Sequence, residues 1–561
     1  MNASYQRWQL YSNLDPELKE ELASYNKTDI EDAFYRHLAF GTAGMRGLIG
    51  PGTNRINRYT VRRTTTGLAR FLSAQGEKTK NQGVVIAYDS RRMSPEFAEE
   101  AACVLAYYGV PVYLFPSLRP TPILSFAVRH LNTAAGIMIT ASHNPPEYNG
   151  YKLYGEDGAQ MPPYKVEHII REIEQIENEL TLPTMSKEEG IRTGLIRILG
   201  DEVDRAYIEK VKSLSLEQQK NPSPDPLRIV FTPLHGTGNL PIRQVLEELG
   251  YTHLYIVPEQ EQPDPDFPTV SSPNPEERQA FDLALTQAKE QKADIVLGTD
   301  PDADRLGLFA KNAAGEYTAF NGNQIGVLLL HYLLERRKEK GKLPENGVVL
   351  KSLVTSEMGT VIAREHGVTM VDVLTGFKYI AEKIEEYRNT GRHTFLFGYE
   401  ESYGYLFGDF VRDKDAVQAA MMCCDMAAYY KQQGRTLDQV LEQLFEKHGV
   451  YAEDLFSMTF KGKAGQEKMD RIMTEWRTTP LKTIGGIPVR ELKDYAKRID
   501  GLPQADVLKY LLEDGCWIAV RPSGTEPKIK FYFSVVAKTR EDAEDKMNRI
   551  QADVRDLVER S

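Results

Sequence analysis

Apolar and polar stretches alternate along the chain in one order that occurs three times. Each occurrence has a β-branched apolar run, a short polar loop, an amphipathic stretch with helical spacing and a second apolar run. The three units begin at VVIAYDS (84–90), LRIVFTP (227–233) and GVVLKSL (347–353). Each amphipathic stretch ends at a glycine (Gly109, Gly250 or Gly367), the residue favoured at a helix C-terminus. The pattern predicts three strand–helix–strand units, which form parallel-rich sheets covered by helices.

Four further apolar runs each lead into a polar loop. They are GIMIT (136–140) into ASHNP, ADIVLG (293–298) into TDPDADR, HTFLFG (393–398) into YEESYG, and CWIAV (516–520) into RPSGTEP. Ligands of α/β sheets bind outside the carboxyl ends of strands. Because each loop has a different ligand-binding chemistry, we expect one central cleft fed by four domains. The alternative is four unrelated polar loops on the surface.

The length of 561 residues allows about three to five domains. The pattern predicts an α/β protein in which three domains repeat one architecture and the last lacks the repeat. The predicted boundaries are 1–205, 206–320, 321–445 and 446–561. In chain order, each range holds one of the four polar loops. We call them the serine loop (ASHNP), the aspartate loop (TDPDADR), the glutamate loop (YEESYG) and the arginine loop (RPSGTEP).

Composition excludes several classes of protein. Lysine plus arginine number 69 and aspartate plus glutamate 80, so the net charge is −11. This balance argues against a nucleic-acid-binding protein, which usually has a basic face. The four cysteines form no C-x-x-C pair, which favours a reducing compartment. The start, MNASYQRWQL, lacks an apolar signal core, and no apolar run reaches the ~18–20 residues of a membrane span. We therefore expect a soluble cytoplasmic protein with no membrane partner.

The stretch TASHNPPEYNGYK (140–152) places a serine directly after an apolar strand. Two prolines then prevent a helix from starting at once, and Asn149-Gly150 predicts a tight turn. Adjacent residues of an extended chain point apart, so we expect no Ser–His dyad. The pattern predicts a rigid loop that carries Ser142, His143 and Lys152.

The stretch GTDPDADRLG has aspartates at alternate positions, Asp300, Asp302 and Asp304. Three carboxylates this close repel one another unless a cation lies between them, and oxygen ligands suit Mg²⁺, Mn²⁺ or Ca²⁺. An EF-hand is excluded because Arg305 stands where its glycine is required and Lys311 where its last glutamate is required. An acidic surface turn is the alternative.

Two more loops have donors and acceptors suited to a sugar phosphate. RPSGTEPK predicts an anion cradle, because Arg521 can bind two oxygens, Ser523 and Thr525 have hydroxyls, and Gly524 lets backbone N–H groups approach. GYEESYG presents carboxylates and a hydroxyl that suit sugar hydroxyls. A Pro/Gly turn and a charged turn are the respective alternatives. A serine near a cation site and an anion cradle indicates a phosphoserine at Ser142, whose charge a divalent cation would neutralise.

Six motifs in the right order resemble the α-D-phosphohexomutase superfamily, and the match covers nearly the whole chain. They are FGTAGMRG (40–47), TASHNPPEYNGYK (140–152), GTDPDADRLG (298–307), TGFKYI (375–380), GYEESYGY (398–405) and RPSGTEPKIKFYF (521–533). Details resemble the bacterial α-phosphoglucomutase branch, near the phosphoglucomutase/phosphopentomutase group. The resemblance implies four domains around a central cleft: three mixed-sheet α/β domains and a C-terminal α+β domain similar to the TATA-box-binding protein.

The resemblance also implies a reaction. A phosphoserine at Ser142 phosphorylates the free hydroxyl of glucose 1-phosphate, the resulting glucose 1,6-bisphosphate reorients, and its other phosphate returns to Ser142 as glucose 6-phosphate leaves. One Mg²⁺ per chain is implied, with glucose 1,6-bisphosphate as activator and intermediate. Small sugar phosphates are the implied partners, and the branch implies a monomer.

Residue roles are implied position by position. The implied metal ligands are Asp300, Asp302, Asp304 and the phosphate on Ser142. The implied catalytic side chains are Ser142, Lys152, His143, Arg305 and Arg46. The implied substrate-binding residues are Glu400, Ser402, Lys378, Lys414, Arg521, Ser523, Gly524 and Thr525. Lys152 matches the acid/base of the family, and a base of this kind needs a lowered pKa, which we expect crowded cations to supply. Lys378 and Lys414 have the alternative of ordinary surface lysines.

Other activities stay open from the sequence. Some bacterial relatives that also use mannose have a histidine shortly after the sugar-loop serine, and the run here, from Ser402 to Tyr405, has none. This favours glucose over mannose. Phosphopentomutase, phosphomannomutase and glucose 1,6-bisphosphate synthase share the mechanism. A metal-dependent phosphatase with Asp300 as nucleophile, or a non-catalytic sugar-phosphate sensor, would each leave a motif without a purpose.

Overall fold

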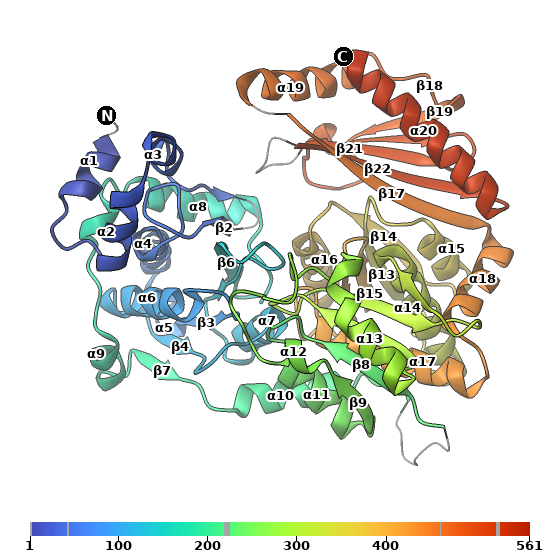
Figure 1. Ribbon diagram of the computed structural model, residues 1–561, viewed down its shortest axis with the longest axis horizontal. Coiled ribbons are helices and arrows are strands. Elements are labelled where there is room, and N and C mark those ends of the chain that lie inside the picture. The colour runs from blue at the N-terminus through green and yellow to red at the C-terminus, as the bar shows by residue number, and fades with distance from the viewer. Residues whose placement is uncertain (1–2, 42–43, 218–224, 461, 523–527, 561) are drawn as a thin grey trace.

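The computed structural model describes residues 3–41, 44–217, 225–460, 462–522 and 528–560. It contains four sheets, which follow one another along the chain and lie in separate groups of helices and strands (Figure 1). The first group is on the left of the view, the second below, the third on the right and the fourth above the third. Each sheet falls inside one predicted domain range, and the boundaries themselves stay predictions.

The first sheet has seven strands. In spatial order they are β1 (Phe40–Gly41), β2 (Gly44–Leu48), β6 (Tyr148–Gly155), β5 (Ala135–Ile139), β3 (Val84–Tyr88), β4 (Val112–Leu114) and β7 (Ile196–Ile198). The helices of this part are α1 (Ala3–Leu10), α2 (Pro16–Ser24), α3 (Lys27–Phe34), α4 (Arg58–Ala74), α5 (Glu77–Gln82), α6 (Ser94–Tyr107), α7 (Thr121–His130), α8 (Pro163–Glu174) and α9 (Lys187–Arg192).

The second and third sheets repeat the centre of the first. The second, in spatial order, has β12 (Tyr317–Phe320), β11 (Leu306–Lys311), β10 (Ile295–Thr299), β8 (Arg228–Thr232) and β9 (His253–Ile256), and its helices are α10 (Glu202–Lys212), α11 (Asn239–Glu248), α12 (Pro258–Glu261) and α13 (Asp282–Gln291). The third has β14 (Thr369–Val373), β13 (Gly347–Ser352), β15 (Thr394–Glu400) and β16 (Gly404–Leu406), with α14 (Gly322–Glu339), α15 (Met358–Glu365), α16 (Phe377–Thr390), α17 (Ala416–Gln432) and α18 (Leu437–His448).

The predicted strand–helix–strand repeat is confirmed in all three sheets. In each, a central strand (β3, β8 or β13) pairs in parallel with the strand after its helix and with the strand that leads into the polar loop. An antiparallel strand then extends the sheet: β6, β11 or β16. The helix-ending glycines Gly109, Gly250 and Gly367 have φ values of 71°, 92° and 70°, the left-handed region that a C-terminal cap requires.

The fourth sheet has a different architecture, as its lack of the repeat predicts. Its strands, in spatial order, are β17 (Val450–Thr459), β22 (Lys528–Ala537), β21 (Trp517–Pro522), β20 (Leu508–Leu512), β19 (Ile487–Asp494) and β18 (Thr483–Ile484). Every strand pair described in it is antiparallel. Its helices are α19 (Gly462–Thr478) and α20 (Arg540–Arg560), and in Figure 1 α20 runs along the sheet. The predicted α+β character of this part is confirmed.

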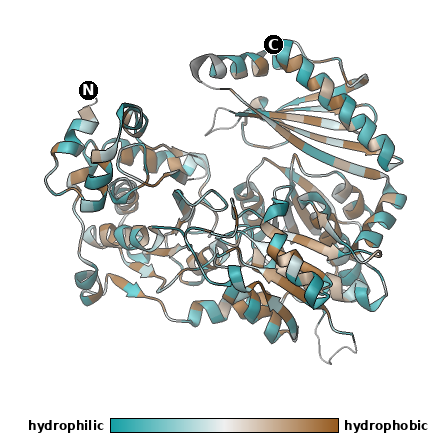
Figure 2. Cartoon of the chain, viewed as in Figure 1, coloured by the Kyte–Doolittle hydropathy of each residue, from teal (hydrophilic) through white to brown (hydrophobic). Residues whose placement is uncertain are grey.

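Apolar side chains hold these layers together. Figure 2 shows hydrophobic residues concentrated in the strands and hydrophilic residues on the outer turns of the helices. The central strands β3, β5 and β10 are buried at every position, as expected for parallel strands covered on both faces. In the part of the chain that the structure describes, none of the helices combines the length and apolarity needed to cross a bilayer.

One turn prediction is wrong. Asn149 and Gly150 lie inside β6, which pairs with β2 on one side and with β5 on the other. A Cβ atom at Gly150 would lie 2.4 Å from the carbonyl oxygen of Thr140. The glycine is therefore required by the close approach of two backbones, and not by a reversal of the chain.

Candidate functional site

A cavity of about 740 Å³ lies where the four sheet-containing parts meet, and residues from each of them line it. Its lining includes most of the side chains singled out in the sequence: Arg46, Ser142, His143, Lys152, Asp304, Arg305, Lys378, Glu400, Ser402, Lys414 and Arg521. Of the cradle predicted in the arginine loop, Arg521 is in place, while Ser523, Gly524 and Thr525 lie outside the described residues. The expectation of one cleft fed by four domains is confirmed for the described residues.

Ser142 follows β5 and is held in an unusual backbone conformation. Its φ is 53°, in the left-handed region, and its backbone N–H donates to Thr140 Oγ1 at 2.8 Å. Its hydroxyl is buried and donates to Asp300 Oδ2 at 2.8 Å. A buried serine in a strained conformation, aimed at a carboxylate, is typical of a functional position rather than of a surface loop.

The expectation that Ser142 and His143 point apart is wrong. Ser142 Oγ lies 3.2 Å from His143 Nδ1. The expectation assumed an extended chain, and the left-handed φ of Ser142 instead turns the two neighbouring side chains toward each other. Burial, with Arg305 and Arg46 nearby, lowers the pKa of His143 well below its ordinary value, so its ring is neutral.

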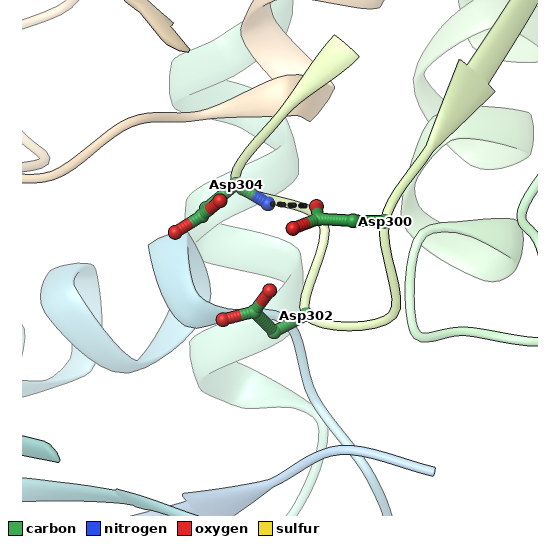
Figure 3. A group of neighbouring side chains, drawn as sticks. All are labelled: Asp300, Asp302 and Asp304. Carbon is green, nitrogen blue, oxygen red and sulfur yellow. Dashed lines mark hydrogen bonds between the residues drawn. The ribbon is translucent and has the colours of Figure 1, made fainter. Parts of the chain in front are cut away.

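The three aspartates after β10 form a compact buried group (Figure 3). One carboxylate oxygen from each lies within 4.8 Å of the others. Asp300 Oδ1 accepts from the backbone N–H groups of Asp304 and Arg305, at 3.1 and 3.0 Å, and the first bond is the dashed line in Figure 3. Burial and the two neighbouring carboxylates raise the pKa of Asp300 well above its ordinary value. The charged groups nearest to this cluster are Lys152 and Lys414, which lie 2.9 Å from Asp302 Oδ2 and 3.0 Å from Asp304 Oδ2.

The donor set of this group fits a hard divalent cation. Asp302 Oδ1 and Asp304 Oδ1 are buried and have no hydrogen-bond partner among the described residues. Buried polar atoms are almost always satisfied, so two unpartnered oxygens within one buried group indicate a missing partner. A cation ligated by oxygens supplies such a partner, and the group can bind a metal ion.

The expected lowering of the Lys152 pKa is wrong. Lys152 Nζ donates to Asp302 Oδ2 at 2.9 Å and lies 3.8 Å from Asp304 Oδ2. Burial alone would lower the pKa of Lys152, but these carboxylates outweigh it and raise the pKa. Burial would likewise raise the pKa of Asp302, and the charge of Lys152 outweighs it and holds that pKa below its ordinary value. The neighbours that matter are anions, whereas the expectation assumed cations.

Lys414 and Arg305 also lie against the aspartate group. Lys414 Nζ is 3.0 Å from Asp304 Oδ2, and its aliphatic chain occupies the space where Gly404 has no Cβ. Arg305 forms an ion pair with Glu276 and keeps its Nε 3.9 Å from Asp304 Oδ1. Lys414 is therefore not an ordinary surface lysine.

The glutamate loop places its first carboxylate at the cavity wall. Glu400 Oε1 accepts from the backbone N–H of Gly376 at 2.7 Å, and burial with the adjacent Glu401 raises the pKa of Glu400 to about 7. Glu401 instead accepts from Ser352 Oγ at 2.9 Å. Burial, followed by the charge of Arg521, lowers the pKa of Lys378 to about 8. Anionic acceptors and cationic donors thus face one cavity.

A buried arginine that was not predicted from the sequence holds the serine loop. Arg91 Nη2 donates to the carbonyl oxygen of Ser142 at 2.6 Å and also to that of Asn144. Arg91 Nη1 donates to the carbonyl oxygens of Pro145 and Tyr148, at 2.8 and 3.1 Å. Arg91 lies just past the end of β3, so the rule on strand-end loops could have found it.

Two further groups of cavity residues were also missed. Glu276, before α13, has no strand-end signal because it lies in a proline-rich loop. Glu453 and Lys530 come from β17 and β22 of the last sheet. The alternation of polar and apolar residues along a strand shows which residues share a face, but it does not show which face borders a cavity. Burial raises the pKa of Glu453 to about 7.

Comparison with known families covers most of the chain. Four models match in order, all described as phosphoglucomutase/phosphomannomutase: alpha/beta/alpha domain I at 37–180, domain II at 205–315, domain III at 321–448, and the C-terminal domain at 477–557.

Curated relatives and solved structures agree with this match. A phosphoglucomutase of Staphylococcus haemolyticus is 41% identical over 523 residues, which is 91% of this chain and 93% of that protein. One from Staphylococcus aureus is 41% identical over 529 residues, 92% and 93% of the two chains. The open form of parafusin, a phosphoglucomutase from Paramecium, has a TM-score of 0.69 at 19% identity and covers 94% of this chain and 95% of its own. This last likeness concerns the fold alone.

Proposed function

The chain belongs to the phosphoglucomutase/phosphomannomutase family and has phosphoglucomutase activity, and we propose that Ser142 carries the phosphoryl group that it transfers. The observation that carries this assignment is the bond from the buried Ser142 hydroxyl to Asp300, at 2.8 Å, beside two carboxylate oxygens that lack partners among the described residues. A phosphoryl acceptor next to a cation site is the arrangement that phosphoryl transfer requires.

Asp300, Asp302 and Asp304 would hold one Mg²⁺ together with a phosphate oxygen on Ser142. When bound, Mg²⁺ neutralises the charge that spreads over the phosphoryl oxygens during transfer. Arg305, which lines the same wall of the cavity, would donate hydrogen bonds to these oxygens. The neutral ring of His143, 3.2 Å from Ser142 Oγ, would help to orient the group.

The transfer proceeds in two balanced steps. The free hydroxyl oxygen of glucose 1-phosphate bonds to the phosphorus on Ser142, the bond from phosphorus to Ser142 Oγ breaks, and the hydroxyl proton leaves the sugar as Oγ regains one. The product is glucose 1,6-bisphosphate. After this intermediate reorients, Ser142 Oγ bonds to the phosphorus at C1, the bond from that phosphorus to the C1 oxygen breaks, the serine proton passes to that oxygen, and glucose 6-phosphate is released. Lys152, protonated beside Asp302, would give a proton to Oγ as the bond to phosphorus breaks and would take the sugar hydroxyl proton in exchange.

The remaining cavity residues would bind the sugar phosphate in both orientations. Glu400 and Ser402 would accept and donate hydrogen bonds to sugar hydroxyls, while Arg521 and Lys378 would bind the phosphate that is not being transferred. A volume of about 740 Å³ lies within the ordinary ~300–1,000 Å³ range of ligand pockets and leaves room for a bisphosphate to turn. Since one chain supplies every wall of this cavity, we expect a monomer to be active.

The test is turnover of glucose 1-phosphate with Mg²⁺ and a trace of glucose 1,6-bisphosphate, read as glucose 6-phosphate. We expect Ser142→Ala to lose at least about 10³-fold of the rate, because the phosphoryl acceptor is removed. Ribose 1-phosphate and mannose 1-phosphate, assayed in parallel, would separate pentose and mannose activities. Release of inorganic phosphate that survives Ser142→Ala would contradict the assignment and favour Asp300 as nucleophile.

A further inference from the structure

A loop of the second domain lies against the serine loop of the first. This loop, residues 262–277, joins α12 to the turn at Arg278–Phe281. The Arg91 guanidinium lies 5.0 Å from the ring centroid of the buried Phe267, Arg92 pairs with Asp266, and Ser272 Oγ donates to the carbonyl oxygen of His143 at 3.1 Å. These contacts fix the loop against the segment that holds Ser142.

At its end, the loop delivers Glu276 to the cavity wall. Glu276 Oε1 accepts from Arg305 Nη1 in an ion pair whose side chains are 34% and 19% exposed. Arg305 Nε is buried and has no hydrogen-bond partner among the described residues. Glu276 thus holds the guanidinium through Nη1, while the Nε–H group has no acceptor in the described part of the chain.

Asp304 lies near the part of the Arg305 guanidinium that Glu276 does not hold. Arg305 Nε lies 3.9 Å from Asp304 Oδ1, which is itself buried and unpartnered among the described residues. A small rotation would pair these two atoms in a charge-assisted hydrogen bond. The guanidinium would then occupy a carboxylate oxygen of the cation site.

We propose that Glu276 is a positioning residue that holds the Arg305 guanidinium clear of Asp304, so that its remaining donors face the phosphoryl group on Ser142. The inference rests on the proposed function, because it is there that Arg305 binds the transferring group. Glu276 does not touch the reacting atoms and acts through Arg305. An anchored fork loses less conformational freedom when it binds phosphate than a free side chain does.

The experiment compares Glu276→Ala, Glu276→Gln and the matched control Glu277→Ala in the glucose 1-phosphate assay. Glu277 is the next residue and does not line the cavity. We expect Glu276→Ala to lower kcat about 10- to 100-fold with KM changed less than about threefold, because misplaced groups slow the chemical step more than binding. Glu276→Gln keeps an acceptor oxygen and should fall between, and Glu277→Ala should match the unaltered enzyme.

A double variant distinguishes positioning from a general structural role. In an Arg305→Met background, Glu276→Ala should lower kcat by less than about a further twofold, because the guanidinium through which Glu276 acts is already absent. Losses that multiply, or an equal loss in Glu277→Ala, would overturn the inference, as would unchanged kcat in Glu276→Ala. Melting temperatures of all variants identify any that fail to fold. If Glu276→Ala does not fold, the kcat of Glu276→Gln tests the inference in its place. Full activity in Arg305→Met would overturn this inference, while the Ser142→Ala assay decides the proposed function separately.

Discussion

Three lysines in one cavity have different pKa values because their neighbours differ. Lys152 and Lys414 lie beside aspartates, at 2.9 Å from Asp302 and 3.0 Å from Asp304, and their pKa values are raised although burial opposes this. Lys378 is buried near Arg521 instead, and its pKa falls to about 8. Burial lowers the pKa of all three lysines, and the neighbouring carboxylates outweigh it at Lys152 and Lys414, while at Lys378 burial and the charge of Arg521 prevail.

The titration of Lys378 predicts a pH effect on substrate capture. Its pKa is lowered from 10.5 to about 8, so the ammonium that would bind phosphate is present below about pH 8 and lost above it. We therefore expect kcat/KM for glucose 1-phosphate to fall as pH rises through about 8. The profile of kcat/KM measures the free enzyme, where this value applies.

Lys378→Arg is the control for this prediction, because a guanidinium stays charged throughout. Its kcat/KM should remain flat where that of the unaltered protein falls. A fall of the same size in both proteins would assign the titration to another group.

Removal of the metal tests the aspartate group. We expect a chelator to lower turnover more than about 100-fold and added Mg²⁺ to restore it, since phosphoryl transfer depends on neutralised charge. Asp302→Asn, which removes one charge from the site, should need higher Mg²⁺ for half-maximal rate. Unchanged turnover in excess chelator would contradict a metal-dependent mechanism.

At the scale of secondary-structure elements, the candidate site is built from residues at the carboxyl ends of four strands. The ends of β3, β5, β10 and β15 lead to Arg91, Ser142, Asp300 and Glu400 respectively. Short loops at the carboxyl ends of neighbouring parallel strands meet at one edge. The Arg91 side chain holds the serine loop in place, because it donates hydrogen bonds to four carbonyl oxygens between Ser142 and Tyr148.

Loss of this clamp should loosen the serine loop. The Arg91 side chain is fully buried, with its Nε 3.4 Å from Asp89 Oδ2, so Arg91→Met removes the ion-pair partner of a buried carboxylate and the guanidinium hydrogen bonds to four carbonyl groups. Breaking a buried pair costs about 3–5 kcal/mol. We expect a lower melting temperature and slower labelling of Ser142 by glucose 1,6-bisphosphate.

Arg92→Met is the matched control for the clamp. Arg92 is the adjacent arginine, and its side chain is 57% exposed in its ion pair with Asp266. An exposed pair contributes about 0–1 kcal/mol, so this variant should melt close to the unaltered protein. Equal destabilisation by both substitutions would show that the backbone bonds of Arg91 are not what stabilises the loop.

At the scale of the whole molecule, the fourth domain is attached to the third through a buried lysine. Lys509 Nζ, from β20, donates to the carbonyl oxygen of Leu353 at 2.7 Å and to Glu357 Oε1 at 3.2 Å. It also lies 4.3 Å from the ring centroid of Trp517. Because Arg521 lines the cavity from this fourth domain, the attachment would set the place of the phosphate that we propose Arg521 binds.

Lys509→Met should therefore weaken substrate binding from a distance. We expect KM for glucose 1-phosphate to rise about 10-fold while kcat changes less, since the groups around Ser142 belong to other domains. Small-angle scattering should show a larger radius of gyration. Lys497→Met, at a lysine that is 72% exposed on the same domain, serves as control. Unchanged KM and radius in Lys509→Met would refute the attachment.

The sequence alone determined the repeated centres of three sheets and the loops that line the cavity. Both result from local rules: alternating or continuous apolar runs specify which face of an element is buried, and ligands bind where strands end. The aspartate group was also predictable as a candidate cation site, because three carboxylates within five residues repel one another strongly once they are buried together.

Only the tertiary structure decided which loops meet and how their side chains face. Ser142 bonds to Asp300 from 158 positions away, and Lys152 to Asp302 from 150. The left-handed backbone of Ser142, the extended path of Asn149 and Gly150, and the anions around Lys152 all contradicted sequence expectations. Each depends on contacts between segments far apart in the chain, and such contacts are set by packing, which local periodicity does not encode.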